Sequence, residues 1–145
     1  IVRYSIAPYL DVQKFWEIVL FSWITGNSDM HCKNFSLLDE GEGYSLSPAY
    51  DLLAVLLAVP NDTDELAMPV FIGGKTSGFN RETFTQALIQ SGVPANAAEK
   101  CIDRMTRHQD KWLEIIDSSF LPDDLKTSYK ELTLARLKLI TGHVF

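Results

Sequence analysis

The segment from Val12 to Ile24 is the part of the sequence that most constrains the fold. Its apolar side chains would lie on almost every face of a helix: Val12, Phe15, Trp16, Ile18, Val19, Leu20, Phe21, Trp23 and Ile24. Asp11 is predicted to be the N-cap, because a short polar side chain can accept a hydrogen bond from the free amides of a first helical turn. Gly26 follows where a left-handed C-cap would end the helix. Since a helix that is apolar all round must be enclosed by other elements, we predict a central, buried helix from about residue 11 to residue 24.

A β-hairpin is predicted after this helix. Residues 35–38 are apolar, residues 39–43 have the composition of a turn, and residues 44–47 alternate between apolar and polar side chains. Pro48 would end the second strand. The next apolar run, Leu52–Val59, fits either a buried strand or a two-turn helix, and its Ala and Leu content favours the helix.

The rest of the chain is predicted to be mostly helical. Residues 66–72 resemble a strand, but a helix is expected from Asn80 to about Gly92, a longer one after Pro94 that extends to about Ile116, and a last one from Pro122 to Gly142. No internal repeat or linker divides the sequence. We therefore expect a single domain over residues 1–145 that is mainly α with a small β-hairpin.

Composition and charge exclude several classes of protein. The 145 residues are 46% hydrophobic and 22% charged, which is typical of a folded chain. A net charge of −6 argues against a basic face that grips nucleic acid directly. The longest apolar run has eight residues, against the ~20 needed to cross a bilayer, so no membrane segment is expected. Cys32 and Cys101 lie too far apart in sequence for a zinc knuckle, and a reducing cytoplasm is predicted.

The polar stretch from Gly26 to Asn34 separates two apolar segments and carries the candidate chemistry. Asp29 and Asn34 lie five positions apart, and Asp51 follows beyond the predicted hairpin. Phosphoryl transfer needs a carboxylate that deprotonates the acceptor hydroxyl, and oxygen ligands for magnesium. Asp29 is therefore the predicted catalytic base, with Asn34 and Asp51 as the metal ligands. Lys33 is predicted to offset the charge of the transferred phosphate.

Two strings make this pattern specific. Residues 26–36 read Gly-Asn-Ser-Asp-Met-His-Cys-Lys-Asn-Phe-Ser, and residues 46–52 read Leu-Ser-Pro-Ala-Tyr-Asp-Leu. The Asp-x-x-x-x-Asn spacing is shared with protein kinases in general, but Ser-Pro-Ala-Tyr-Asp stands where their Asp-Phe-Gly would be. Both strings closely resemble the HipA family of bacterial toxin serine/threonine kinases. Glu-Leu-Ala-Met at residues 65–68, followed by Gly-Gly-Lys at residues 73–75, is similar to that family too.

The resemblance implies a protein-kinase-like C-terminal lobe, the helical subdomain of an α+β kinase fold. It implies ATP and magnesium as cofactors, the same base and metal ligands as above, and His31, Lys33 and Tyr50 on the nucleotide side. The implied partners are a protein substrate such as an aminoacyl-tRNA synthetase and a HipB-type DNA-binding antitoxin. No Gly-rich phosphate loop or strand lysine precedes Asp11. The N-terminal lobe that clamps ATP is thus expected outside this chain, and the isolated chain is expected to be inactive.

Other interpretations remain open. An Asp-x-x-x-x-Asn pair can simply be turn chemistry, and Asp51 could cap a helix that begins in the Leu52 run. A non-catalytic, pseudokinase-like helical interaction module would keep the fold without the activity. A small-molecule phosphotransferase of the aminoglycoside-kinase kind would use the same residues, although those enzymes usually carry His-Gly-Asp where this chain has Asn-Ser-Asp at residues 27–29.

Overall fold

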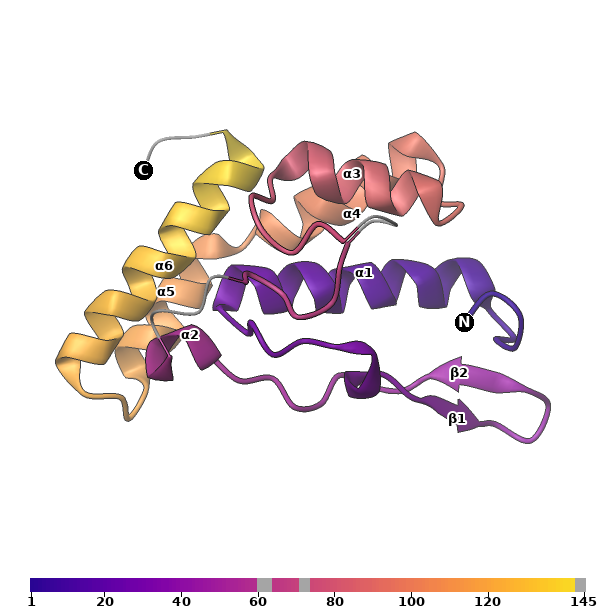
Figure 1. Ribbon diagram of the computed structural model, residues 1–145, viewed down its shortest axis with the longest axis horizontal. Helices are drawn as coiled ribbons and strands as arrows, with labels where there is room; N and C mark the ends of the chain where they lie inside the picture. Colours follow the sequence, from indigo (N-terminus) through magenta and orange to yellow (C-terminus); the bar gives the residue numbers. More distant parts are fainter. Residues whose placement is uncertain (60–63, 71–73, 143–145) are drawn as a thin grey trace.

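Helix α1 (Pro8–Thr25) lies at the centre of the molecule, as its apolar sequence predicts (Figure 1). The computed structural model describes residues 1–59, 64–70 and 74–142. The other elements are the 3-10 turn η1 (Cys32–Asn34), strands β1 (Leu37–Asp39) and β2 (Tyr44–Leu46), and helices α2 (Val55–Ala58), α3 (Arg81–Gln90), α4 (Ala95–Thr106), α5 (Gln109–Ser118) and α6 (Asp123–Thr141).

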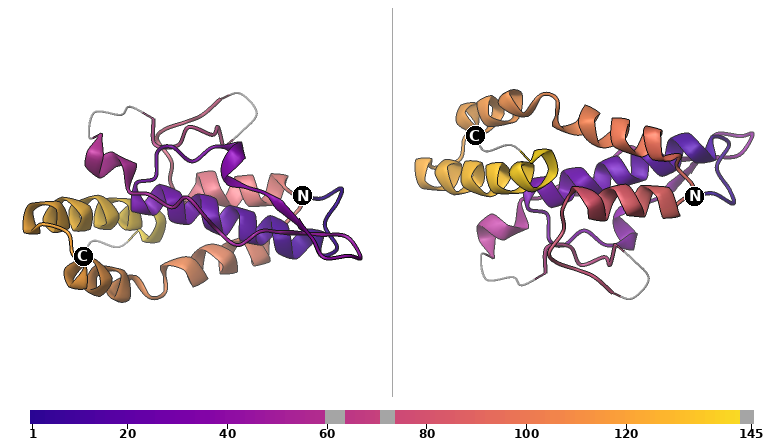
Figure 2. Two further views of the ribbon diagram at one scale, coloured as in Figure 1. Left: turned by 90° about the horizontal axis from the view of Figure 1, so that it is seen from below. Right: turned by 90° about the horizontal axis from the view of Figure 1, so that it is seen from above.

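The helices and the hairpin enclose α1 from different sides. Helices α3, α4 and α6 pack on it, and β2 contacts it near its beginning. Helices α4 and α5 lie along one side of α1, and the segment that carries η1 and α2 lies along the opposite side (Figure 2). Val19, Trp23 and Ile24 are completely buried. The core is therefore organised around α1, and the mainly α fold with a small hairpin is confirmed.

Asp11 does not cap α1, and that prediction was wrong. The helix begins three residues earlier at Pro8, whose fixed backbone angle suits the first helical position. Asp11 is instead buried in the first turn, where it accepts hydrogen bonds from the Ser5 hydroxyl at 2.7 Å and the Leu46 amide at 2.9 Å. Burial alone would raise the pKa of this carboxyl, but these bonds, with the nearby Lys14 ammonium, lower its pKa below the usual 3.8. Asp11 thus ties the first residues, α1 and β2 together.

The hairpin and the end of α1 follow the sequence closely. Strands β1 and β2 are antiparallel, with Leu37 opposite Leu46 and Asp39 opposite Tyr44. Gly26 ends α1 in the left-handed conformation, at φ 80°. A Cβ at this position would lie 2.6 Å from Cδ2 of Leu132 on α6, so a larger residue would both strain the backbone and force the Leu132 side chain to shift.

The C-terminal half is helical with two corrections. The Asn80 side chain caps α3 by accepting from the Thr83 amide at 3.0 Å, and Gly142 ends α6, both as predicted. The single long helix expected after Pro94 is broken at residues 107–108 into α4 and α5. Helix α4 packs on α1, α3 and α6, and α5 continues along α6.

The region between the hairpin and α3 has less regular structure than predicted. The Leu52–Val59 run forms only the single turn α2. Residues 66–70 form no strand, and residues 71 and 72 of that prediction, like Gly73 of the Gly-Gly-Lys string, lie outside the described residues. Within the described part of the chain, no helix combines the length and apolar character needed to cross a membrane.

Candidate functional site

The loop after α1 is fixed by its own backbone and by one buried side chain. The Asn27 amide donates to the Ser22 carbonyl at 2.8 Å, which turns the chain sharply out of the helix. At η1, the Asn34 amide donates to the His31 carbonyl at 3.0 Å, and the Asn34 side-chain oxygen accepts from the His31 amide at 2.8 Å. Asn34 is buried although it is an amide side chain. The stretch that the sequence marked as catalytic is therefore an ordered loop around Asn34.

The hairpin returns the chain so that Asp51 meets this loop. Nδ2 of Asn34 donates to Oδ2 of Asp51 at 2.7 Å, and Nδ2 of Asn27 donates to the Asp51 main-chain carbonyl at 3.1 Å. Asp51 has φ 56°, and among the described residues it is the non-glycine residue with a left-handed backbone. Such strained positions persist where the surroundings over-determine them, and they cluster at functional sites. The two predicted metal ligands are thus in direct contact, and two asparagines hold Asp51 in place.

Tyr50 and Lys33 are also brought together. The Tyr50 hydroxyl donates to the main-chain carbonyl of Lys33 at 2.9 Å, while both side chains remain exposed. Nδ1 of His31 is buried and has no hydrogen-bond partner among the described residues. The three residues predicted on the nucleotide side therefore belong to the same loop pair as Asn34 and Asp51.

Asp29 lies at the exposed position of the loop, between two buried neighbours. The carbonyls of Ser28 and Met30 accept hydrogen bonds from the amides of Ala67 and Met68, at 2.7 and 2.9 Å. No described residue donates a hydrogen bond to the Asp29 carboxylate. The backbone is thus held on both sides of an exposed side chain.

Two supporting residues were not predicted. Asn27 holds the Asp51 carbonyl, and Glu65 accepts from Trp23 Nε1 at 2.6 Å, the Gly78 amide at 3.0 Å and the Phe79 amide at 3.3 Å. Glu65 therefore anchors the segment that pairs with residues 28–30. Both lie inside the strings that resemble HipA, so their place in those strings was a signal that could have identified them.

The donor set suits a hard cation better than a soft one. Among residues 1–59, 64–70 and 74–142, no three His, Cys, Asp or Glu side chains gather as a metal site. The oxygens of Asp51 and Asn34 are the ligand type that magnesium prefers, with water completing its shell. Cys32 is exposed, and burial, followed by the Glu17 carboxylate, raises the pKa of the Cys101 thiol to about 12. Sγ of Cys101 lies 3.6 Å from the Glu17 carboxylate, outside the loop that carries Asn34.

Comparison with known proteins gives consistent matches. The family model described as the HipA-like C-terminal domain matches residues 1–113. The Sinorhizobium fredii (strain NBRC 101917 / NGR234) protein named "Putative kinase Y4mE" is 38% identical over 68 residues, which are 47% of this chain and 16% of that protein. "Putative kinase Y4dM" of the same strain is 47% identical over 47 residues, 32% of this chain and 12% of that protein.

A solved structure shows the same architecture. It is the complex of the Shewanella oneidensis MR-1 toxin–antitoxin system HipA, HipB and its operator DNA, which matches with a TM-score of 0.72 and 26% sequence identity. The match covers 90% of this chain and 32% of the neighbour's chain. The present chain thus spans about a third or less of the proteins that it resembles.

Proposed function

This chain belongs to the family of HipA-like C-terminal domains, and on that premise we propose that it forms the catalytic lobe of an ATP-dependent serine/threonine protein kinase. The observation that carries the proposal is the contact between Asn34 and Asp51, which joins two residues 17 positions apart in sequence. The left-handed backbone of Asp51 and its hydrogen bonds to Asn34 and Asn27 support the proposal, because unusual backbone positions cluster at functional sites. The kinase-like character of the helical fold is part of this proposal.

Each residue of the site has a role in this reaction. Asp29 accepts the proton of the substrate hydroxyl while the hydroxyl oxygen forms a bond to the γ-phosphorus of ATP. The bond between the γ-phosphorus and the bridging oxygen breaks, and ADP leaves. Asp51 and Asn34 would hold magnesium, and the bound ion would neutralise charge on the phosphate oxygens. Lys33 would add a positive charge beside the phosphates, and His31 and Tyr50 would line the nucleotide. The hydrogen bonds on Asp51 keep its carboxylate oriented before nucleotide arrives.

Asn34 can serve as a ligand without unfolding its loop. Its amide oxygen accepts one hydrogen bond, from the His31 amide, and an amide oxygen has two lone pairs. Asp51 has an exposed carboxylate whose Oδ2 accepts from Asn34. The residues present therefore fit magnesium.

We further propose that other parts of a longer polypeptide complete the active site. The 145 residues span about a third or less of the proteins that they resemble, so the isolated chain should transfer phosphate negligibly. The partners proposed are a protein substrate, for example an aminoacyl-tRNA synthetase, and a HipB-type antitoxin in a cytoplasmic setting. The HipB and DNA in the neighbouring HipA complex, and the net charge of −6, support a basic DNA-binding partner.

The test uses the longest natural polypeptide that contains this segment. We expect magnesium-dependent ATP binding that Asp51→Ala abolishes and the exposed α6 variant Asp124→Ala does not. Asp29→Asn should keep ATP binding but slow protein phosphorylation about 10²- to 10⁴-fold, the usual contribution of a general base. ATP binding that survives Asp51→Ala would instead favour the interaction module. Phosphorylation of small molecules but no protein would favour the aminoglycoside-kinase type.

A further inference from the structure

The chain on either side of Asp29 is held by a segment that lies far from it in the sequence. The Ala67 amide donates to the Ser28 carbonyl at 2.7 Å, and the Met68 amide donates to the Met30 carbonyl at 2.9 Å. Ser28 and Met30 are buried, whereas Asp29 between them is exposed. The position of the Asp29 backbone therefore depends on where residues 67 and 68 lie.

Glu65 anchors this segment with both of its carboxylate oxygens. Oε2 accepts from Trp23 Nε1 at 2.6 Å and from the Phe79 amide at 3.3 Å, and Oε1 accepts from the Gly78 amide at 3.0 Å. All three partners are donors, so each oxygen must act as an acceptor. A glutamine has one acceptor oxygen, and its amino group would face a donor in either orientation. The anchor thus requires a carboxylate and not merely a polar side chain of that size.

Arg136 of α6 contacts the same tryptophan. Its guanidinium donates to the Trp23 main-chain carbonyl, and its Cζ lies 5.2 Å from the centroid of the Trp23 ring. Burial lowers the pKa of Arg136, and the Glu65 carboxylate acts in the opposite direction, so the two charges attract each other. Arg136 lies outside residues 1–113, the part of the chain that the family model matches. The anchor of the Asp29 loop therefore extends to α6.

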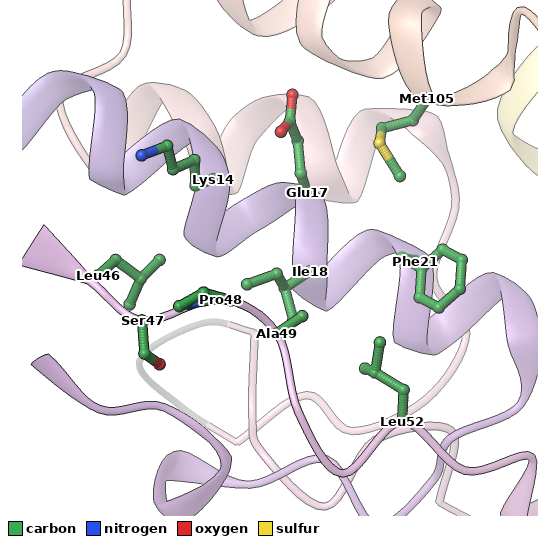
Figure 3. Close-up of a pocket in the computed structure, with 10 residues that line it drawn as sticks. All are labelled: Lys14, Glu17, Ile18, Phe21, Leu46, Ser47, Pro48, Ala49, Leu52 and Met105. Carbon is green, nitrogen blue, oxygen red and sulfur yellow. The ribbon is translucent and has the colours of Figure 1, made fainter. Parts of the chain in front are cut away.

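Asp51 is held by different residues. Its main-chain carbonyl accepts from the Asn27 side chain, and its carboxylate accepts from the Asn34 side chain. A groove of about 470 Å³ lies between residues 46–52, which carry Asp51, and the face of α1 that includes Ile18 (Figure 3). Because packing against α1 does not fill this space, the orientation of Asp51 depends strongly on the two asparagines.

We propose that Glu65 is a positioning residue for Asp29, and that it acts separately from the asparagines that position Asp51. Trp23 and Arg136 in turn fix Glu65. The inference rests on the proposed function, in which Asp29 is the base and Asp51 binds the metal. A displacement of about 1 Å can lower the rate of a reaction about 100-fold. Displacing the anchored segment should therefore slow phosphoryl transfer, whereas the affinity for magnesium and ATP should be retained.

The test uses the longest natural polypeptide that contains this segment. Glu65→Gln should lower kcat about tenfold and leave the dissociation constant of magnesium-ATP within about twofold. Asn27→Ala should show the reverse pattern, with magnesium-ATP bound about tenfold more weakly and a smaller change in kcat. Without nucleotide, hydrogen–deuterium exchange in peptides that span residues 64–70 should be faster in Glu65→Gln and unchanged in Asn27→Ala. Glu131→Gln, at an exposed position of α6, is the control and should change none of these quantities.

A second variant displaces the segment without changing Glu65, in case Glu65→Gln reduces the amount of folded protein. Ala67→Pro removes the amide that donates to Ser28, at a position whose side chain is exposed, and should also lower kcat but not the affinity for ATP. An unchanged kcat, equal losses in kcat and ATP affinity, or unchanged exchange in residues 64–70 of Glu65→Gln would overturn the inference. A natural polypeptide that neither binds ATP nor phosphorylates protein would instead overturn the proposed function, and the exchange measurement would still decide whether Glu65 holds the segment.

Discussion

The amide nitrogen of Asn34 donates a 2.7 Å hydrogen bond to the carboxylate of Asp51, across a hairpin that separates them by 17 residues. The same asparagine accepts from the His31 amide, so one buried side chain joins the loop to the segment that follows the hairpin. The shape of the candidate site therefore depends on Asn34 at least as much as on the two aspartates that flank it in sequence.

Replacing Asn34 with alanine should destabilise the fold. The change removes two hydrogen bonds from a buried position and leaves the His31 amide unpaired, so we expect a loss of about 2 kcal/mol in the free energy of unfolding. Urea denaturation measures it. Asn96→Ala, at an exposed position in α4, is the control and should change the free energy by less than about 0.5 kcal/mol. Equal changes in unfolding free energy in the two variants would show that the hydrogen bonds of the Asn34 side chain do not stabilise the fold.

Asp51 offers a direct measure of its backbone strain. Asp51→Ala and Asp51→Gly both remove the carboxylate, but only alanine keeps a Cβ at φ 56°. A residue with a Cβ in the left-handed region destabilises the fold by ~1–2 kcal/mol relative to glycine. Glycine offsets part of this advantage, because it has more conformational freedom to lose from the unfolded chain. The glycine variant should therefore be more stable than the alanine variant by about 1 kcal/mol in chemical denaturation. An alanine variant as stable as the glycine variant would contradict the left-handed geometry.

Asp11 should make stability depend on pH in the acid range. Its pKa is lower in the folded protein than in the unfolded chain, so its contribution is fully present above the unfolded value. That contribution is lost as the pH falls from about 4 through the folded pKa. The difference in unfolding free energy between the natural protein and Asp11→Asn should thus shrink from pH 7 to pH 2. A difference that stays constant over this range would refute the assignment, and the exposed Asp124→Asn serves as the control.

Gly26 should be less replaceable than Gly142, although both end helices with left-handed backbones. A Cβ at Gly26 would approach Leu132 at 2.6 Å, whereas one at Gly142 would meet nothing within 4 Å. Gly26→Ala should therefore cost at least about 1 kcal/mol more than Gly142→Ala in thermal or urea unfolding, because the clash adds to the shared conformational cost. Leu132→Ala should recover part of this excess in a double-mutant cycle. If the effects of Gly26→Ala and Leu132→Ala on the unfolding free energy are additive, the loss of stability at Gly26 comes from the backbone conformation alone.

Local patterns predicted those elements whose signals are local. The apolar run gave α1, Asn80 gave the start of α3, and turn residues around Gly43 gave the hairpin. Asp11 was wrongly predicted as an N-cap, because a carboxylate that can cap a helix can also accept a hydrogen bond from an amide distant in sequence, here that of Leu46. The break between α4 and α5 at residues 107–108 has no glycine or proline to mark it, so no local signal in the sequence predicted it.

The sequence by itself determined the enclosed central helix, the hairpin, the family and the identity of the candidate site residues, because periodicity, turn chemistry and ordered strings can be recognised without coordinates. Only the tertiary structure decided that Asn34 contacts Asp51, that Asn27 and Glu65 support them, and that Asp51 has a left-handed backbone. These are relationships between residues far apart in the chain. They depend on how the hairpin and the segment at residues 65–68 return to the loop after α1, and no local pattern specifies that return.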